Sequence, residues 1–219
     1  MLEGHHYIIG KPNMNGCPFG DKLQHQWIRR HQLFERFDQG IIIDRSGLSC
    51  AKPEIAAHRL AAQLRGNRIF IAHPNLGITA IACAIAGKQV LTATTDHHHV
   101  HIAKHNASIY NIDHQITFLE ADPRQIMRDA KPRDFDAIIL DPPFPPASKT
   151  SSNQALHLHD FDPPLTPLLQ HAASCSSQIA LLTPSSLDLN PLSQYASNIH
   201  IHNFAIDNNT SHRTILLWN

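Results

Sequence analysis

Residues 68–94 read RIFIAHPNLGITAIACAIAGKQVLTAT, two short apolar runs on either side of a longer apolar stretch. The outer runs, Arg68–Ala72 and Gln89–Thr94, have the length of buried strands, and the stretch between them, Gly77–Ala86, is long enough for a helix. A strand, a helix and a second strand in this order are typical of a parallel sheet whose crossover connection is helical. These residues therefore predict an α/β fold.

The same alternation continues toward the C-terminus. Further strands are predicted at Ile116–Glu120, Asp136–Asp141 and Gln178–Thr183, and helices near His97–Tyr110, Asp122–Asp129 and Leu165–Ser174. The end differs, because NIHIHNFAI (198–206) and HRTILLWN (212–219) alternate apolar and polar residues on either side of a turn. We therefore expect a mostly parallel, Rossmann-like sheet that ends in a C-terminal antiparallel hairpin.

The first 65 residues have another character. Residues 1–20 carry Gly, Pro and Asn without periodicity, and a helix is predicted from about Asp21 because large side chains then recur every three or four residues. Three of these, Trp27, Phe34 and Phe37, are expected in the core. A second helix is predicted from Pro53 to Arg65. We expect residues 1–65 to form a lead-in and helical extension on a domain of residues 66–219, in one compact unit.

Composition limits the partners and the compartment. The chain of 219 residues has 18 Lys plus Arg and 18 Asp plus Glu, so a polyanion has to be held locally and be small. The four cysteines are scattered, which indicates reduced thiols rather than a zinc site or a disulfide framework. No signal peptide and no run of about 20 apolar residues is present. We expect a soluble intracellular protein, cytoplasmic or nuclear, that does not bind membranes.

The segment DHHHVH (96–101) raises the question of a metal, because His97 and His101 are spaced to share one helical face. Histidine occurs 18 times in this chain, so such a pair is expected by chance. No carboxylate or cysteine supplies an obvious third ligand. We interpret the segment as a solvated helix start and expect no metal.

The segment FDAIILDPPFPP (135–146) carries the chemistry. It places Asp141 at the carboxyl end of a strand, where open α/β sheets bind their ligands. The Asp141 carboxylate and the Pro142 carbonyl are positioned to accept the two N–H groups of an exocyclic amine, and Phe144 offers a face on which its base stacks. The segment thus fits an amino-group methyltransferase. The alternative interpretation is a proline-stiffened loop.

A methyl donor that contains adenosine needs a close turn after the first strand, a ribose contact after the second and an adenine contact after the third. Asp122 follows the third strand and suits the adenine amine. The first turn has one glycine, Gly77, where several are usual, and Thr94 stands where the ribose acid is expected, with Asp96 two residues later. We predict a donor site made by these residues, with a reduced motif.

With these residues in view, the chain resembles the trimethylguanosine synthase family, which methylates the N2 amine of guanine in an RNA cap. The most specific part is the front segment, QWIRRHQLFERFDQGIIIDRSG (26–47) with KPEIAAH (52–58). Similar segments follow at IAKHNASIYNI (102–112), ITFLEAD (116–122), LLTPSSLDLNPL (181–192) and HNFAIDNNTSHRTILLW (202–218). The resemblance implies a Rossmann-like class I methyltransferase fold with the helical extension placed over donor and cap.

The chain departs from the family pattern at several positions. Lys52 replaces the Thr of a Thr-Pro-Glu triplet, and Asp141-Pro142-Pro143-Phe144 replaces Ser-Pro-Pro-Trp. Other departures are Leu48 for Trp, Ile71 for the first-strand acid, Thr94 for the ribose acid and Ser185 for a basic residue. These changes keep an acceptor and an aromatic ring in the motif but reduce the donor site.

The leading hypothesis is an enzyme that methylates a guanine N2 amine in RNA with S-adenosylmethionine. Arg36 and Lys52 are candidates for contacts with RNA phosphates, although such residues are often only a solvated helix face. The alternative is an inactive methyltransferase fold that serves as an RNA-binding or scaffolding subunit. The same chemistry on adenine N6 or on a ribosomal guanine also stays open.

Overall fold

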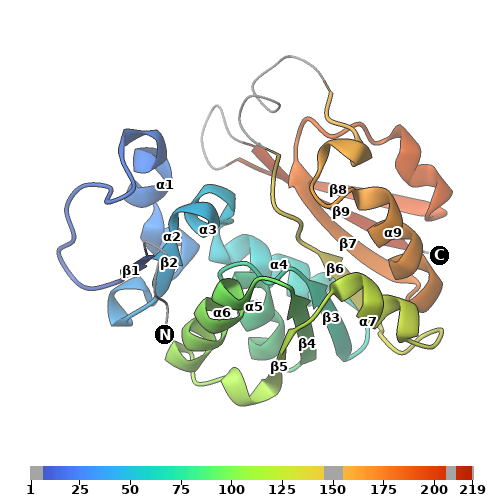
Figure 1. Ribbon diagram of the computed structural model, residues 1–219, viewed down its shortest axis with the longest axis horizontal. Coiled ribbons are helices and arrows are strands. Elements are labelled where there is room, and N and C mark those ends of the chain that lie inside the picture. The colour runs from blue at the N-terminus through green and yellow to red at the C-terminus, as the bar shows by residue number, and fades with distance from the viewer. Residues whose placement is uncertain (1–6, 146–154, 206–210, 219) are drawn as a thin grey trace.

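A seven-stranded sheet forms the centre of the computed structural model, which describes residues 7–145, 155–205 and 211–218 (Figure 1). The strands are β3 (Arg68–Ala72), β4 (Gln89–Thr94), β5 (Ile116–Glu120), β6 (Ala137–Leu140), β7 (Gln178–Pro184), β8 (Asn198–Ala205) and β9 (Ser211–Trp218). Their order is β5-β4-β3-β6-β7-β9-β8. β3 to β7 are parallel, and β9 is antiparallel to both β7 and β8. The predicted α/β sheet with a C-terminal hairpin is confirmed.

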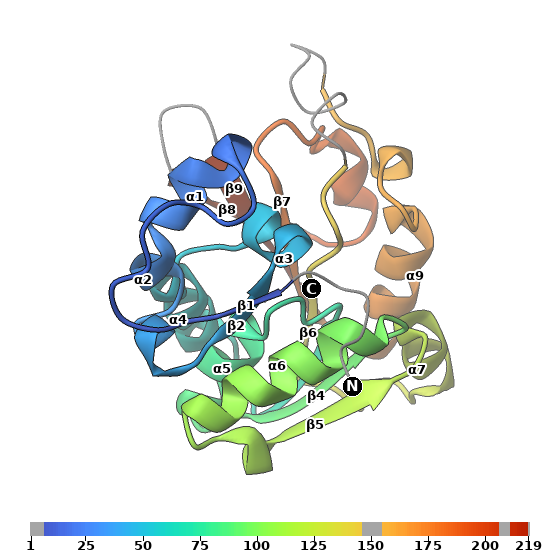
Figure 2. The ribbon, with the colours of Figure 1, turned by 60° about the vertical axis from the view of Figure 1, so that its left-hand side comes forward.

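Helices cover both faces of this sheet, as Figure 2 shows. α4 (Glu54–Gln63), α5 (Ile78–Ile85) and α6 (His97–Ile109) pack on one face, and α7 (Pro123–Asp129) and α9 (Leu165–Cys175) on the other. Side chains alternate along a strand. Ile69 and Ile71 therefore pack into the core between the sheet and α4, α5 and α6, while Phe70 and Ala72 pack into the core between the sheet and α7 and α9. Burial on both faces explains why these strands read as continuous apolar runs.

The part of the helical extension that precedes α4 lies beside α4 and α6 (Figure 1). It contains β1 (Tyr7–Ile9), η1 (Asp21–Leu23), α1 (Gln24–Ile28), α2 (Arg30–Leu33), η2 (Phe37–Gln39), β2 (Ile42–Asp44) and α3 (Arg45–Cys50), and β1 pairs with β2 in an antiparallel ribbon. The remaining short helices are η3 (Asp113–Gln115), η4 (Leu158–Asp160) and η5 (Asn190–Gln194). None of the helices in the described ranges is long and apolar enough to cross a membrane.

The prediction of one continuous helix from Asp21 is wrong. The backbone leaves helical geometry at Arg29 (φ −93°, ψ 11°) and again at Phe34 (φ −140°, ψ 114°). The breaks let Trp27, Phe34 and Phe37 enter the same core, where each is at most 1% exposed, so their predicted burial is confirmed. Tertiary packing has overridden local helical periodicity here.

Parallel strands β3 and β6 are neighbours at the centre of the sheet. The chain leaves β3 toward β4 and leaves β6 toward β7, on opposite sides. This reversal opens a crevice beyond the carboxyl ends of the two strands, the place where open α/β sheets bind ligands.

Candidate active site

A pocket of about 360 Å³ occupies this crevice. Residues that follow β3, β4 and β6 line it, together with residues of α3: Ser46, Cys50, His73, Asn75, Thr94, Thr95, Asp96, His99, Asp141 and Pro143 are among them. Its volume lies within the range of small-molecule sites. A larger hollow of about 720 Å³ lies at the opposite, amino ends of β3 and β4, so we place the site at the carboxyl ends.

The turn after β3 has three residues in the left-handed region, His73 (φ 63°), Asn75 (φ 53°) and Gly77 (φ 90°). A glycine-rich loop adopts this region without cost, while His and Asn are among the few other residues enriched there. The backbone turn is thus formed with a single glycine. In the sequence, the residues that indicate this turn are His73 and Asn75, and a search for glycines alone misses them.

Two polar atoms of this turn, His73 Nε2 and Asn75 Oδ1, are buried and have no hydrogen-bond partner in the described structure. Burial lowers the pKa of His73, although the negative charges of Asp141 and Asp122 act to raise it, and this shift favours the neutral ring. Buried polar groups are nearly always satisfied in folded proteins. Both residues line the pocket, so a polar ligand bound there would provide the missing partners.

Gly77 has a packing role that is separate from the pocket. It caps α5 with φ 90°, and a Cβ at this position would lie 3.1 Å from the Cα and 3.2 Å from the carbonyl oxygen of Ala103. The contact is with the α6 backbone, which would have to shift to accept a side chain here. Gly77 therefore permits α5 and α6 to pack closely.

Thr94 and Asp96, predicted near the ribose, both line the pocket. The Asp96 N–H donates to Thr94 Oγ1 at 3.1 Å. Asp96 also begins α6, because its Oδ1 accepts from the N–H groups of His98 (2.9 Å) and His99 (3.2 Å). The Asp96 side chain is thus held in place by the helix that it caps.

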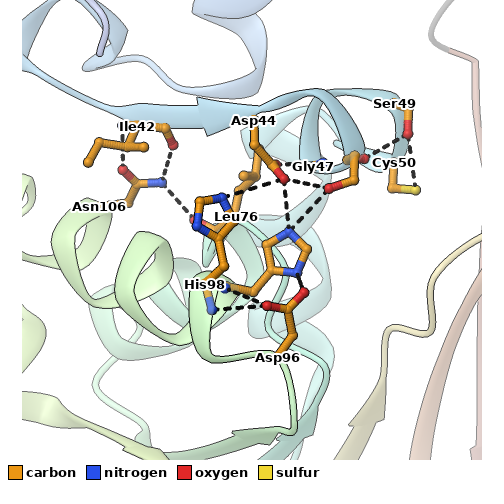
Figure 3. A network of polar contacts seen from close by, with 11 residues as sticks. Ile42, Asp44, Gly47, Ser49, Cys50, Leu76, Asp96, His98 and Asn106 are labelled. Carbon is orange, nitrogen blue, oxygen red and sulfur yellow. Dashed lines mark hydrogen bonds and ion pairs between the residues drawn. The ribbon is translucent and has the colours of Figure 1, made fainter. Parts of the chain in front are cut away.

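The extension contacts α6 through a charged network (Figure 3), and three members of this network, Ser46, Asp96 and His99, line the pocket. His99 lies between two carboxylates, with Nε2 3.5 Å from Asp44 Oδ2 and Nδ1 3.0 Å from Asp96 Oδ2. Burial would lower the pKa of His99, but Asp44 and Asp96 together raise it. Burial would raise the pKa of Asp44, yet hydrogen bonds from His99 and Ser46 lower it to about 2.

This network makes stability depend on pH. Because the pKa of His99 is raised in the folded state, its contribution is fully present below the unfolded value of about 6.5 and is lost as pH rises through the folded pKa. We expect the melting temperature to fall more steeply between pH 6 and pH 8.5 in the wild type than in His99→Gln. Thermal melts of both chains check this, since all other histidines cancel in the difference. Parallel curves would contradict it.

The end of β6 brings together Asp141, Phe144 and Lys52. The Lys52 Nζ lies 2.5 Å from Asp141 Oδ1 and 5.5 Å from the centroid of the Phe144 ring. Lys52 is 6% exposed and Asp141 4%. Two positions that depart from the family pattern, 89 residues apart, thus contact each other.

Arg36 and Asp122 are not among the residues that line the pocket. Arg36 donates to the Ile109 carbonyl at the end of α6 (2.9 Å) and lies over the Tyr110 ring. Asp122 caps α7, and its carboxylate accepts from Arg124, with Nη2 and Oδ2 2.8 Å apart. The Arg124 hydrogen bond lowers the pKa of Asp122. Their substrate and adenine contacts stay predictions.

His97 and His101 contact each other on α6. Their Nε2 atoms are 2.9 Å apart, and His97 Nδ1 lies 2.5 Å from Glu120 Oε2. Within the described ranges, no three or more His, Cys, Asp or Glu side chains converge as metal ligands.

Comparison with known proteins agrees with this geometry. Residues 76–215, more than half of the chain, match the family model for RNA cap guanine-N2 methyltransferase. The chain belongs to this family. The resemblance inferred from the sequence is confirmed.

A curated relative, the trimethylguanosine synthase of Schizosaccharomyces pombe, is 28% identical over 199 residues, which is 85% of this chain and 80% of the relative. Among solved structures, the human methyltransferase 10 domain containing protein superposes with a TM-score of 0.63 at 13% identity, over 90% of this chain and 97% of that one. A Pyrococcus abyssi tRNA (uracil-54, C5)-methyltransferase bound to S-adenosyl-L-homocysteine gives a TM-score of 0.53 at 15% identity, over 74% of this chain and 37% of that one. These structures confirm the class I methyltransferase fold.

Sequence reasoning missed four further residues of the site, Asp44, His73, Asn75 and His99. Asp44 follows an apolar run and precedes Ser46 and Gly47, a pattern that signals a helix N-cap. No comparable signal marks His99 among its neighbouring histidines. Its partners come from two separate parts of the chain.

Proposed function

We propose that this protein transfers a methyl group from S-adenosylmethionine to the N2 amine of a guanine in an RNA cap. The observation that carries the proposal is the position of Asp141, which follows a central strand and lines the pocket at the switch point of a methyltransferase sheet. Family membership supplies the class of acceptor.

The donor suits the side of the pocket formed by the ends of β3 and β4. The side chains of His73 and Asn75 have polar atoms without a hydrogen-bond partner in the described structure, and these atoms would form hydrogen bonds with the polar end of the donor. Thr94 and Asp96 would contact the ribose, and Asp122 the adenine amine. When bound, S-adenosylmethionine supplies a methyl group that its sulfonium already activates, so the protein needs no strong acid or base.

The acceptor suits the β6 side of the pocket. Asp141 and the Pro142 carbonyl accept the two N–H groups of the guanine amine, and neither proline nitrogen of the motif can donate in competition. Phe144 stacks on the base, which stabilises binding by about 1–3 kcal/mol. These contacts turn the nitrogen lone pair toward the donor side. The nitrogen would form the new N–C bond while the bond between the donor sulfur and its methyl carbon breaks, which leaves S-adenosylhomocysteine, and the nitrogen would then release one proton to solvent.

A substitution at His73 can separate the contacts of the β3 turn with the donor from the backbone strain of the same turn. His73→Gly removes a side chain in the left-handed region, which relieves roughly 1 kcal/mol of strain, and it also removes the unpartnered Nε2. We expect a melting temperature equal to or above that of the wild type, with about tenfold weaker binding of S-adenosylhomocysteine. Calorimetric titration measures the affinity. Unchanged binding would exclude His73 from the donor site.

Methyl transfer tests the proposal directly. Radiolabelled S-adenosylmethionine is incubated with the protein and a capped RNA, the same RNA without a cap, or a ribosomal RNA fragment. We expect label only on the capped RNA and, after digestion, a cap guanosine methylated at N2 by mass spectrometry. Label on adenine N6 or on ribosomal guanine would redirect the proposal to those acceptors. No label, together with no binding of S-adenosylhomocysteine at millimolar concentration, would favour an RNA-binding or scaffolding subunit.

A further inference from the structure

Lys52 belongs to the helical extension, in the short link between α3 and α4, yet its ammonium group lies at the end of β6. We propose that Lys52 is a positioning residue for methyl transfer, because it fixes both groups that receive the guanine, the Asp141 carboxylate and the Phe144 ring. This inference rests on the proposed function. It replaces the sequence-based interpretation of Lys52 as a phosphate contact.

The burial of Lys52 argues against a role in binding an RNA phosphate. The side chains of Lys52 and Asp141 are 7% and 5% exposed, and the two charges are 2.5 Å apart. A phosphate bound to Lys52 would have to displace this carboxylate. In the described structure, Asp141 is the carboxylate paired with the Lys52 ammonium, and the Phe144 ring lies 5.5 Å from the same nitrogen.

Stabilisation of the fold also does not explain why a Lys52–Asp141 ion pair is buried here. Removing two charges from water is costly, and a buried ion pair is often no more stabilising than two apolar side chains of similar volume. An ion pair differs from two apolar side chains because it fixes the orientation of the charged groups. Lys52 binds Oδ1 of Asp141, which sets the rotation of the carboxylate and leaves Oδ2 to accept an amine N–H from the pocket.

The backbone on both sides of Lys52 is well fixed. Pro53 follows it with φ −56°, and α3 before it is held at the pocket rim by the Asp44–His99 contact. Lys52, Asn75 and Asp141 also line one small hollow next to the main pocket. The extension can therefore set the orientation of Asp141 through one side chain.

A double-mutant cycle tests the inference. The chains are wild type, Lys52→Met, Asp141→Asn and the double variant, in which both charges are removed. Lys88→Met is the matched control, because Lys88 is likewise a lysine held by hydrogen bonds but lies at the opposite end of the sheet. Its ammonium group donates to the carbonyl groups of Leu64 (2.9 Å) and Gly66 (2.6 Å). The measurements are kcat and KM with capped RNA, the affinity for S-adenosylhomocysteine, and the melting temperature.

We expect Lys52→Met to lower kcat about tenfold or more, since misorientation of an aligned group costs rate. Adding Lys52→Met to Asp141→Asn should lower kcat less than about threefold further, because most of the effect of Lys52 passes through Asp141 and only the contact with the Phe144 ring is left to lose. Affinity for S-adenosylhomocysteine should change less than about threefold, and Lys88→Met should keep kcat. If Lys52→Met does not fold, a large loss of kcat between Asp141→Asn and the double variant would still overturn the inference.

Each other outcome overturns the inference. A kcat of Lys52→Met within about twofold of the wild type would make the pair purely structural. Losses that multiply in the double variant would mean that Lys52 contacts the RNA independently of Asp141. A wild type that transfers no methyl group would defeat the proposed function itself, and the role of Lys52 with it.

Discussion

Replacing Asp141 by asparagine is expected to lower kcat for capped RNA about 100-fold, because the amide accepts the guanine N–H poorly and directs its own N–H groups at the amine. The side chain keeps its size and can still accept from Lys52, so the fold should survive. Affinity for S-adenosylhomocysteine should stay close to that of the wild type. Steady-state kinetics with radiolabelled donor measure kcat and KM separately.

Asp136→Asn is the matched control for this experiment. It is the same substitution at the other end of the same strand, where the carboxylate accepts the N–H groups of Asn67 and Arg68. We expect its kcat to equal that of the wild type. Wild-type activity in Asp141→Asn would remove Asp141 from the reaction and with it the observation on which the proposed function depends.

Replacing Asn106 by alanine is expected to destabilise the protein by about 3–5 kcal/mol, since it leaves several buried backbone groups unsatisfied. Asn106 is fully buried on α6. Its Oδ1 accepts the Ile42 N–H (2.7 Å), and its Nδ2 donates to the carbonyls of Ile42 and Leu76 (both 2.9 Å), as Figure 3 shows. One side chain thus joins the extension, α6 and the turn beside the pocket.

Urea unfolding measures this loss as a change in the free energy of unfolding. Ser108→Ala on the same helix is the control, because Ser108 is exposed and donates only to the His105 carbonyl one turn earlier. That variant should stay within about 0.5 kcal/mol of the wild type. A loss below about 1 kcal/mol for Asn106→Ala would mean that water or a shift of β2 satisfies the freed groups.

The central sheet could be predicted from the sequence because its inner strands β3, β6 and β7 are buried on both faces. Each strand is a short apolar run that local hydrophobicity reveals, and β3, β4 and β5 have the predicted bounds. β6 is shorter by one residue at each end than the predicted strand 136–141, because Asp136 and Asp141 lie just outside the ladder. The position of Asp141 at a carboxyl end followed directly.

The extension could not be predicted in the same way. Its large side chains recur at helical spacing, but burying Trp27, Phe34 and Phe37 in one core requires breaks at Arg29 and Phe34. A short segment such as α1 or α2 gains little from its own hydrogen bonds, so contacts with the rest of the core determine its shape.

The sequence by itself determined the fold class, the family and the motif that follows β6, since each depends on residues that are close together in the chain. Only the tertiary structure decided that Lys52 faces Asp141, that His99 joins Asp44 to Asp96, and that His73 and Asn75 form a turn with a single glycine. The first two are contacts between side chains on separate elements, and the third is a backbone conformation. Local periodicity records which face of an element is buried, but not which partner the folded chain brings to it.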